Sequence, residues 1–285
     1  MKKILITGGK GQLGMSLNSI KKSYPRYQMV FTDIEELDIS DKEGIGKTLD
    51  EDEYYAIINC AAYTAVDKAE EEVELSTKLN ALAPKYLGEE ASKRGIRLIH
   101  ISTDYVFDGS KNTPYSPKDE AEPNSIYGKT KLEGEKNIMS IEGLSYLIIR
   151  TSWLYSQYGH NFVKTMARLG SERDEITVVY DQVGSPTYAK DLAIGIMEAL
   201  EIMDADTREL FHFSNEGVCS WYDFAYKIME LKDLKAKVSP ILSKGYPTPA
   251  PRPHYSVLDK SEFRAYTQRD IPHWEESLKI CIKNI

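Results

Sequence analysis

The sequence predicts an α/β fold in which a doubly wound parallel sheet carries a smaller, discontinuous C-terminal lobe. Two observations predict this class: short apolar runs rich in β-branched residues recur along the chain, and helix-like stretches lie between them. The runs are continuously apolar rather than alternating, which is typical of strands with helices on both faces. Alternation of such strands with helices favours a doubly wound parallel sheet.

The expected elements follow one another from the N-terminus. The strand-like runs span residues 2–7, 28–33, 54–60, 97–102, 146–151, 176–180 and 210–214. Clear helix-like stretches between them span residues 73–95 and 189–203. We expect the last run, 210–214, to return to the sheet after the chain has formed part of the lobe.

The amino-acid composition of the sequence changes after residue 151. Residues 152–162 and 246–256 are rich in turn formers, aromatic residues and prolines, as expected for loops of a smaller lobe. We therefore predict a sheet domain at 1–151, rejoined by about 183–214, and a lobe formed mainly by 152–182 and 215–285.

The composition limits the partners and the compartment. The 36 basic and 44 acidic residues leave a net charge of −8 with no basic tract, which argues against nucleic acid or an anionic membrane as partner. Cys60, Cys219 and Cys281 lack CxxC spacing, so reduced thiols are expected. The scattered histidines predict no metal site. With no signal peptide and no long apolar run, we expect a cytoplasmic location.

The first strand-like run is followed by glycines at three-residue spacing, Gly8, Gly11 and Gly14. Between a strand and a helix, glycine permits a tight turn and lets a phosphate approach the N–H groups of the helix N-terminus. Asp33 ends the second run, about 20 positions later, where a carboxylate can bind the ribose hydroxyls of adenosine. A plain tight turn is the alternative, but this context predicts that 1–151 is a Rossmann-type dinucleotide-binding domain.

The choice between the two nicotinamide dinucleotides depends on Asp33. A carboxylate there favours NADH, because it repels the 2′-phosphate of NADPH. Lys10 or Arg26 could offset that charge. Both cofactors, NADPH and NADH, therefore stay open.

A tyrosine and a lysine stand at helical spacing, Tyr127 and Lys131, so both would project from one face of a helix. An ammonium near a phenol lowers the phenol's pKa from about 10, which makes tyrosine an acid for a carbonyl oxygen as hydride reaches its carbon. Thr103 and Asp104 follow the strand 97–102, at the sheet edge where such folds contact ligands. The pair alone could be an exposed helix turn, but the combination predicts a catalytic site.

Longer blocks of the sequence resemble the extended short-chain dehydrogenases, and more narrowly the dTDP-4-dehydrorhamnose reductase family. The blocks are GQLG, NCAAYTAVDKAE, STDYVFDG, YGKTKLEGE, RTSWLYSQYGHNFVKTM, DQVGSPT and YPTPAPRPHYSVLD, and the match covers nearly the whole chain. The resemblance implies that the 4-keto group of dTDP-4-dehydro-L-rhamnose is reduced to dTDP-L-rhamnose, the last step of dTDP-rhamnose biosynthesis, which supplies polysaccharide biosynthesis.

The resemblance also implies residue roles. Tyr127 would donate the proton, Lys131 would lower its pKa and bind the nicotinamide ribose, and Thr103 takes the place held by serine in many relatives. The pyrophosphate of the cofactor would contact Gly8, Gly11, Gln12, Leu13 and Gly14. Its adenosine would lie near Asp33 or the Asp38–Ile39 pair. Its middle would lie beside Ala61, Ala62 and Tyr63, and Asn80 would brace the site. The substrate would meet Thr103, Asp104 and Trp153 at the sugar, Asn161, Lys164 and Arg252 at the diphosphate, and Gln182 at the nucleotide.

Other aromatic and charged residues have a simpler interpretation. His100, Trp221 and Trp274 are expected to fill the core, and a solvated charge is the better account of Lys164 alone. For Asn80, a helix N–H or a water partner is an equally good account. Some relatives are magnesium-bridged dimers with glutamates at the contact, whereas the corresponding positions here are Met15 and Lys190. A monomer or weak homodimer without metal is therefore expected.

Rival functions share the same fold. A dehydratase needs a second carboxylate after Thr103-Asp104, and Tyr105 stands there instead. A nucleotide-sugar epimerase is less strongly disfavoured. The regulatory subunit of methionine adenosyltransferase also resembles this family, so a regulator or a dinucleotide-sensing protein is possible on fold alone. An intact Thr103, Tyr127 and Lys131 favours an enzyme.

Overall fold

The computed structural model describes all residues, 1–285, and its main sheet has six parallel strands in the order β10-β5-β4-β3-β1-β2. The strands are β1 (Lys2–Thr7), β2 (Tyr27–Phe31), β3 (Tyr54–Asn59), β4 (Arg97–Thr103), β5 (Tyr146–Thr151) and β10 (Arg208–Phe213). The strand order reverses beside β1, where doubly wound sheets place their ligands. The predicted fold class is confirmed.

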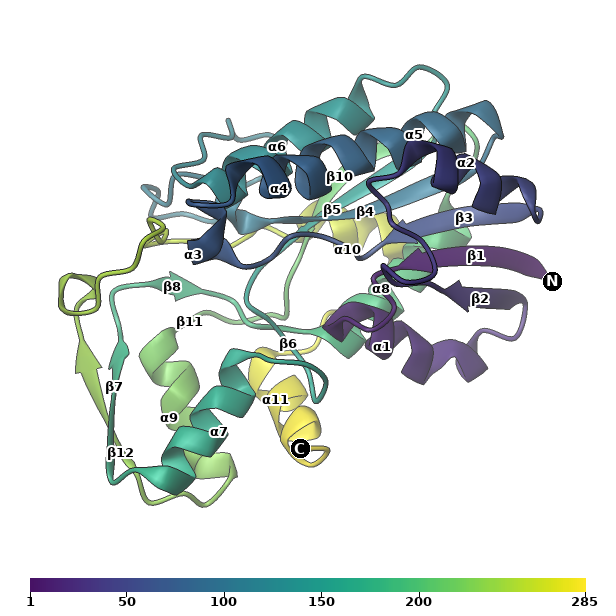
Figure 1. Cartoon of the computed structure of the whole chain (residues 1–285). Coiled ribbons are helices and arrows are strands. Elements are labelled where there is room, and N and C mark those ends of the chain that lie inside the picture. Colours follow the sequence, from purple (N-terminus) through teal and green to yellow (C-terminus); the bar gives the residue numbers. More distant parts are fainter.

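Helices cover both faces of this sheet (Figure 1). On one face lie α1 (Gln12–Ile20), α8 (Ala189–Ile202) and α10 (Ser261–Thr267); on the other lie α2 (Lys42–Asp50), α5 (Ala83–Lys93) and α6 (Ile126–Met139). Successive side chains of one strand enter opposite cores: Ile4 and Ile6 pack with α1 and α8, and Leu5 packs with α2 and α5. The strand runs are continuously apolar because both of their faces are buried.

The smaller lobe has its own apolar core. It contains α7 (Phe162–Glu172), α9 (Trp221–Leu231), α11 (Trp274–Ile282) and the parallel pair β7 (Glu175–Val179) and β12 (Lys237–Ile241). The short pairs are β6 (Leu154–Tyr155) with β9 (Thr187–Tyr188), and β8 (Val183–Gly184) with β11 (Cys219–Ser220). The run 176–180 thus forms a strand of the lobe, not of the main sheet; its alternation of exposed and buried residues fits a sheet covered on one face only.

The remaining elements are short. They are α3 (Val66–Ala69), α4 (Val73–Thr77), the π-helix η2 (Lys78–Leu82) and the 3₁₀ turns η1 (Lys21–Ser23), η3 (Asp104–Val106) and η4 (Ser243–Gly245). The expected helix 73–95 therefore divides into α4, η2 and α5. Because α10 packs against α8 and β10, part of the C-terminal chain returns to the main sheet. The exact division into domains stays a prediction.

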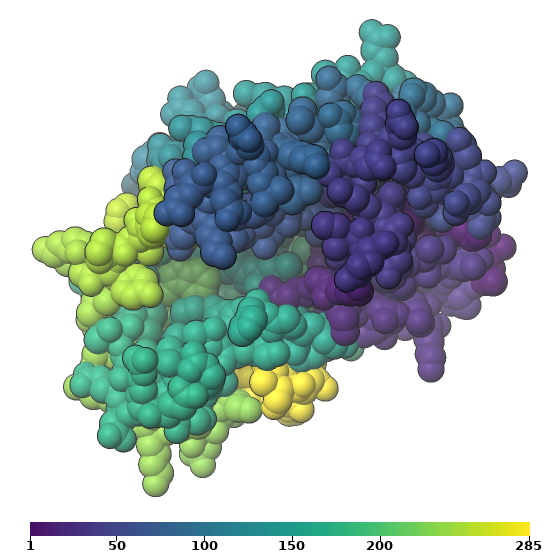
Figure 2. All heavy atoms as spheres, in the orientation of Figure 1, coloured from purple at the N-terminus to yellow at the C-terminus, as the bar shows by residue number.

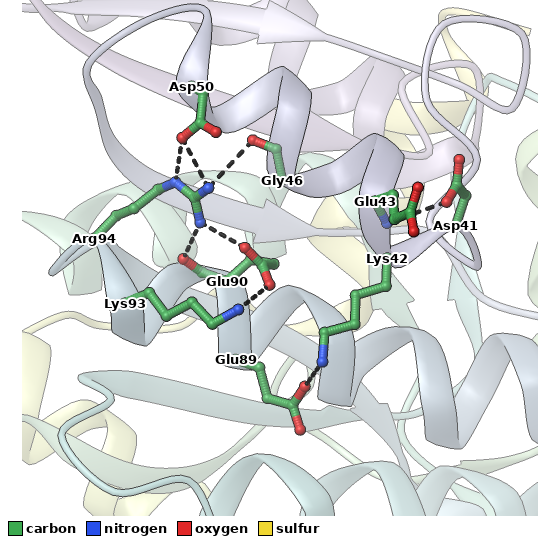
Figure 3. Close-up of polar contacts among 9 residues, drawn as sticks. All are labelled: Asp41, Lys42, Glu43, Gly46, Asp50, Glu89, Glu90, Lys93 and Arg94. Carbon is green, nitrogen blue, oxygen red and sulfur yellow. Dashed lines mark hydrogen bonds and ion pairs between the residues drawn. The ribbon is translucent and has the colours of Figure 1, made fainter.

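Salt bridges connect α2 to α5 (Figure 3). Arg94, just after α5, donates to the Asp50 carboxylate at 2.8 Å and to the Glu90 carboxylate at 2.6 Å. Lys42 of α2 pairs with Glu89 of α5. No helix of the chain combines the length and the apolar character needed to cross a membrane.

A buried ion pair joins α6 to the sheet. Arg150 of β5 donates to both carboxylate oxygens of Glu135 of α6, at 2.9 and 2.6 Å. The side chains are 4% and 0% exposed, so neither charge has access to water. Each charge therefore depends on the other for stabilisation.

The Arg150→Met variant should lose about 3 kcal/mol of unfolding free energy, because Glu135 is left as an uncompensated buried charge. Urea denaturation measures the loss. The double variant Glu135→Leu, Arg150→Met should recover most of it, since both charges are then gone. A single variant as stable as the wild type would show that the pair does not hold α6.

Candidate active site

A cleft of about 730 Å³ lies at the carboxyl ends of the main-sheet strands. Figure 2 shows the hollow between the sheet domain and the lobe. Among the predicted residues, the cleft is lined by Gly8, Gly11, Gln12, Leu13, Asp33, Ala61, Ala62, Thr103, Asp104, Tyr127, Lys131 and Trp153. It does not reach Gly14, Asp38, Ile39, Tyr63, Asn161, Lys164, Gln182 or Arg252. One cavity thus contains the glycine loop and the predicted catalytic residues, but not the residues predicted for the dTDP end of the substrate.

The glycine loop forms a close-fitting turn between β1 and α1. Gly8 has φ of 65°, and a Cβ there would lie 2.8 Å from the backbone nitrogen of Ala61. A Cβ on Gly14 would lie 2.4 Å from the Gly8 oxygen, so Gly14 serves helix–strand packing. Gly11 caps α1 without a side-chain hydrogen bond, which leaves the first N–H groups of the helix free for a ligand. The loop therefore fits a dinucleotide pyrophosphate.

The end of the cleft beside β2 is acidic. Asp33 Oδ2 accepts a hydrogen bond from the Lys10 backbone N–H at 2.9 Å, which fixes the carboxylate at the glycine loop. The Lys10 ammonium pairs with Glu35, and Arg26 pairs with Glu201 at 3.4 Å. Both cations that could offset Asp33 are therefore already paired.

The other predicted adenosine contacts lie outside the cleft. Asp38 accepts hydrogen bonds from the backbone and hydroxyl of Ser40, which hold the pKa of its carboxyl below the ordinary value. Ile39 is buried in the core beneath α2. In this structure Asp33, rather than the Asp38–Ile39 pair, faces the cleft.

Asn80 braces the strand exit after β3. Its buried amide accepts from the Tyr63 N–H at 2.9 Å and donates to the Tyr63 oxygen at 3.0 Å. The Tyr63 hydroxyl turns away and donates to Glu72. Asn80 thereby fixes the backbone next to Ala61 and Ala62, which line the cleft.

The helix α6 carries Tyr127 and Lys131 into the cleft. It begins after Ser125, whose hydroxyl accepts the Gly128 N–H at 3.1 Å. The Lys131 Nζ donates to the Ile101 carbonyl at 2.6 Å, and burial lowers its pKa to about 8.

The predicted lowering of the Tyr127 pKa by Lys131 is not found. Desolvation raises that pKa above its ordinary value, and a hydrogen bond with the Thr103 hydroxyl opposes the rise only in part. The Lys131 ammonium is occupied elsewhere, at Ile101. Tyr127 is therefore a phenol with a proton to give, which is the form a proton donor needs.

Two buried oxygens at the cleft have no hydrogen-bond partner, Asp104 Oδ2 and Ser102 Oγ. The other Asp104 oxygen accepts from the Thr103 hydroxyl at 3.0 Å. Burial raises the pKa of Asp104 to about 6. Both oxygens line the cleft and can accept a hydrogen bond from a ligand there.

Trp153 forms one wall of the cleft in a strained conformation. Its φ is 48°, unusual for a side chain of this size. The indole stacks on that of Trp221, with ring centroids 3.6 Å apart. Trp221, predicted to be core, is half-buried and supports this wall. A flat apolar surface of this kind suits the face of a sugar ring.

The remaining predicted substrate residues make contacts within the protein. Arg252 donates to Asp67 at 2.6 Å and to the Tyr105 hydroxyl at 3.0 Å, beside a small adjoining cavity. Asn161 caps α7 and donates to Gln12 at 2.9 Å, which ties the lobe to the glycine loop.

Lys164 and Gln182 lie away from the cleft. The Lys164 ammonium contacts the Gln157 oxygen at 3.4 Å, and the Gln182 amide donates to Ser243 at 2.9 Å. Sequence reasoning missed Tyr105 as a site residue, although it lines both cavities. Its position directly after Thr103-Asp104 is the signal that could have found it.

Comparisons with known proteins agree over the full chain. A family model described as RmlD substrate binding domain matches residues 1–285. The dTDP-4-dehydrorhamnose reductase of Aggregatibacter actinomycetemcomitans is 39% identical over 98% of both chains. The spore coat polysaccharide biosynthesis protein SpsK of Bacillus subtilis is 37% identical over 98% of this chain and 96% of its own.

Solved structures with the same name are similarly close. That of a dTDP-4-dehydrorhamnose reductase from Clostridium acetobutylicum has a TM-score of 0.93 and 43% identity, covering 99% of this chain and 98% of its own. The Bacillus anthracis enzyme, solved in complex with NADP, has a TM-score of 0.94 and 38% identity over 100% of both chains. The matches span the whole chain, and the chain belongs to the dTDP-4-dehydrorhamnose reductase family.

Proposed function

We propose that the chain reduces the 4-keto group of dTDP-4-dehydro-L-rhamnose to dTDP-L-rhamnose with NADH or NADPH. The observation that carries the proposal is that Tyr127, Lys131 and Thr103 share one cleft with the glycine loop. A dinucleotide held by that loop and a sugar beside Tyr127 would lie in the same cavity. The full-length likeness to named reductases supports this substrate.

Each group of the site has a definite task in this reaction. The glycine loop and the N-terminus of α1 hold the pyrophosphate, and Lys131 binds the nicotinamide ribose; the bound nicotinamide supplies the hydride. Tyr127 donates its phenolic proton to the sugar oxygen, and the Thr103 hydroxyl orients the carbonyl. Asp104 accepts a hydrogen bond from a sugar hydroxyl, and Trp153 lies against the ring.

The dTDP end of the substrate is assigned to Arg252, whose guanidinium can bind a phosphate through two hydrogen bonds. Its present partner, Asp67, would have to release it. Arg252 lines the small cavity that shares Tyr105 with the cleft, whereas Asn161, Lys164 and Gln182 line neither cavity and stay predictions for the same end.

The proposal extends to assembly and location. Met15 and Lys190 provide no carboxylates for a metal bridge, which supports a monomer or a weak homodimer. Three free cysteines and a net charge of −8 support a cytoplasmic protein with no nucleic-acid or membrane partner. Light scattering with and without magnesium tests the assembly.

The Tyr127→Phe variant should lose at least about 100-fold in kcat/KM, because the proton donor is removed. Its affinity for NADH should change little, since the phenol ring remains. Absorbance at the nicotinamide band follows the reaction, and fluorescence titration measures the affinity. Retained turnover would assign the proton to another group, and a regulatory protein would show no turnover in either form.

The activity should fall as pH drops through about 6, the pKa of Asp104. The carboxylate predominates above that pH and accepts the sugar hydroxyl, whereas the protonated acid is a poorer acceptor. The Asp104→Asn variant should lose about 10-fold or more in kcat/KM and lose this acid limb. An unchanged acid limb in Asp104→Asn would exclude Asp104 as its source.

NADH should be preferred over NADPH, because Asp33 faces the cleft, Lys10 pairs with Glu35, and Arg26 pairs with Glu201 outside the cleft. The Asp33→Ala variant should reduce this preference about 10-fold, equivalent to about 1.4 kcal/mol. The ratio of kcat/KM for the two cofactors measures it. A strong NADPH preference that Asp33→Ala leaves unchanged would refute the assignment.

A further inference from the structure

A buried chain of polar groups lies behind Lys131 and is not used by any role assigned above. Lys131 Nζ lies 3.2 Å from His100 Nε2, and His100 Nδ1 lies 3.0 Å from Asn59 Nδ2. The Asn59 oxygen accepts from the Thr7 hydroxyl at 2.7 Å. The four side chains belong to β1, β3, β4 and α6, and none is more than 2% exposed.

The orientation of the Asn59 amide follows from its neighbours. Asn59 Oδ1 also faces the backbone N–H of Ala61 at 3.2 Å. A backbone N–H can only donate, so the oxygen, not the amide nitrogen, must lie on that side. The amide nitrogen then faces His100 Nδ1, and because it too can only donate, His100 Nδ1 must be the acceptor.

The state of His100 follows in turn. A neutral imidazole carries one N–H, so an accepting Nδ1 places the proton on Nε2. Burial holds the pKa of His100 well below its ordinary value, which keeps the ring neutral. The proton on Nε2 therefore points at Lys131 Nζ.

An ammonium and an amine respond differently to that proton. An ammonium has three donors and no lone pair, so it cannot accept a hydrogen bond from His100 Nε2–H. An amine has a lone pair and accepts that hydrogen bond. The Ile101 carbonyl at 2.6 Å accepts an N–H from Nζ in either state. The network as a whole is satisfied only when Lys131 is uncharged.

We infer that His100, oriented by Asn59, is a positioning residue that holds Lys131 in the cleft wall and makes its ammonium easier to deprotonate in the free protein. This inference rests on the proposed function, in which Lys131 binds the nicotinamide ribose. The ammonium would donate hydrogen bonds to the ribose hydroxyls from three N–H groups, and an amine has only two. His100, together with burial, therefore sets the upper pH limit of the reaction.

Burial lowers the Lys131 pKa, and no side chain around Lys131 other than His100 adds to that lowering. The titratable and charged side chains that face it or share its part of the cleft are His100 on β4, Asp104 just after β4, and Tyr127 and Glu135 on α6. Glu135 favours the charged lysine, and is itself bound to Arg150. Of this set, only His100 lies within hydrogen-bond distance of Nζ.

Nitrogen NMR of the wild-type chain tests the inference without any substrate. In protein labelled with ¹⁵N-histidine, the His100 signals are those lost in His100→Gln. We expect a neutral ring with the proton on Nε2 and a bare, accepting Nδ1 from about pH 6 to pH 9. A proton on Nδ1, or titration near the ordinary value of about 6.5, would overturn the inference.

The pH profile of kcat/KM tests the consequence. The wild type should lose activity above about pH 8, where Lys131 loses its proton. In His100→Gln the amide can turn its oxygen to Nζ and accept from the ammonium, so the basic limb should move up by about one pH unit.

The matched control is His212→Gln. His212 is a buried histidine of the same sheet, and its ring nitrogen Nδ1 lies 3.0 Å from the Tyr115 backbone oxygen. It makes no hydrogen bond with Lys131. Its variant should keep the wild-type limb even if it is less stable. Equal shifts in both variants, or none in His100→Gln, would overturn the inference. A wild type that does not turn over dTDP-4-dehydro-L-rhamnose would instead refute the proposed function, and the NMR result would still decide the state of His100.

Discussion

The site depends on the close approach of α6 to the rest of the sheet domain. A Cβ on Gly128 would lie 2.1 Å from the Tyr105 oxygen, and one on Gly134 would lie 2.1 Å from the Asn80 oxygen. Only glycine permits these distances. The Glu135–Arg150 pair then fixes the helix to β5. Because α6 lies this close, Tyr127 and Lys131 reach the cleft, and Lys131 reaches the strand carbonyl at Ile101.

The same packing shifts the pKa values of Tyr127 and Lys131 in opposite directions. Burial keeps the Tyr127 proton in place and makes the Lys131 proton easier to lose. The cations around the cleft are few in a chain of net charge −8, and Lys10 and Arg252 already hold carboxylates. In the proposed function, binding of the anionic substrate would require Asp67 to release Arg252 to a phosphate.

Features that depend on neighbouring residues could be predicted from the sequence. The strands, the glycine turn and the helical spacing of Tyr127 and Lys131 are local, and the structure has all of them. Features set by distant residues could not. Arg252 pairs with Asp67 from the far end of the chain, and His100 meets Lys131 only because β4 and α6 pack together. The pKa of Tyr127 depends on burial, which spacing alone does not reveal.

The most direct test of the central claim is product analysis with the purified wild-type chain. dTDP-4-dehydro-L-rhamnose is generated in situ, NADH or NADPH is supplied, and the sugar nucleotide is identified by proton NMR. The account predicts that dTDP-L-rhamnose forms in equal amount to the nicotinamide oxidised. A chain that binds the dinucleotide but oxidises none of it with this substrate would contradict the account.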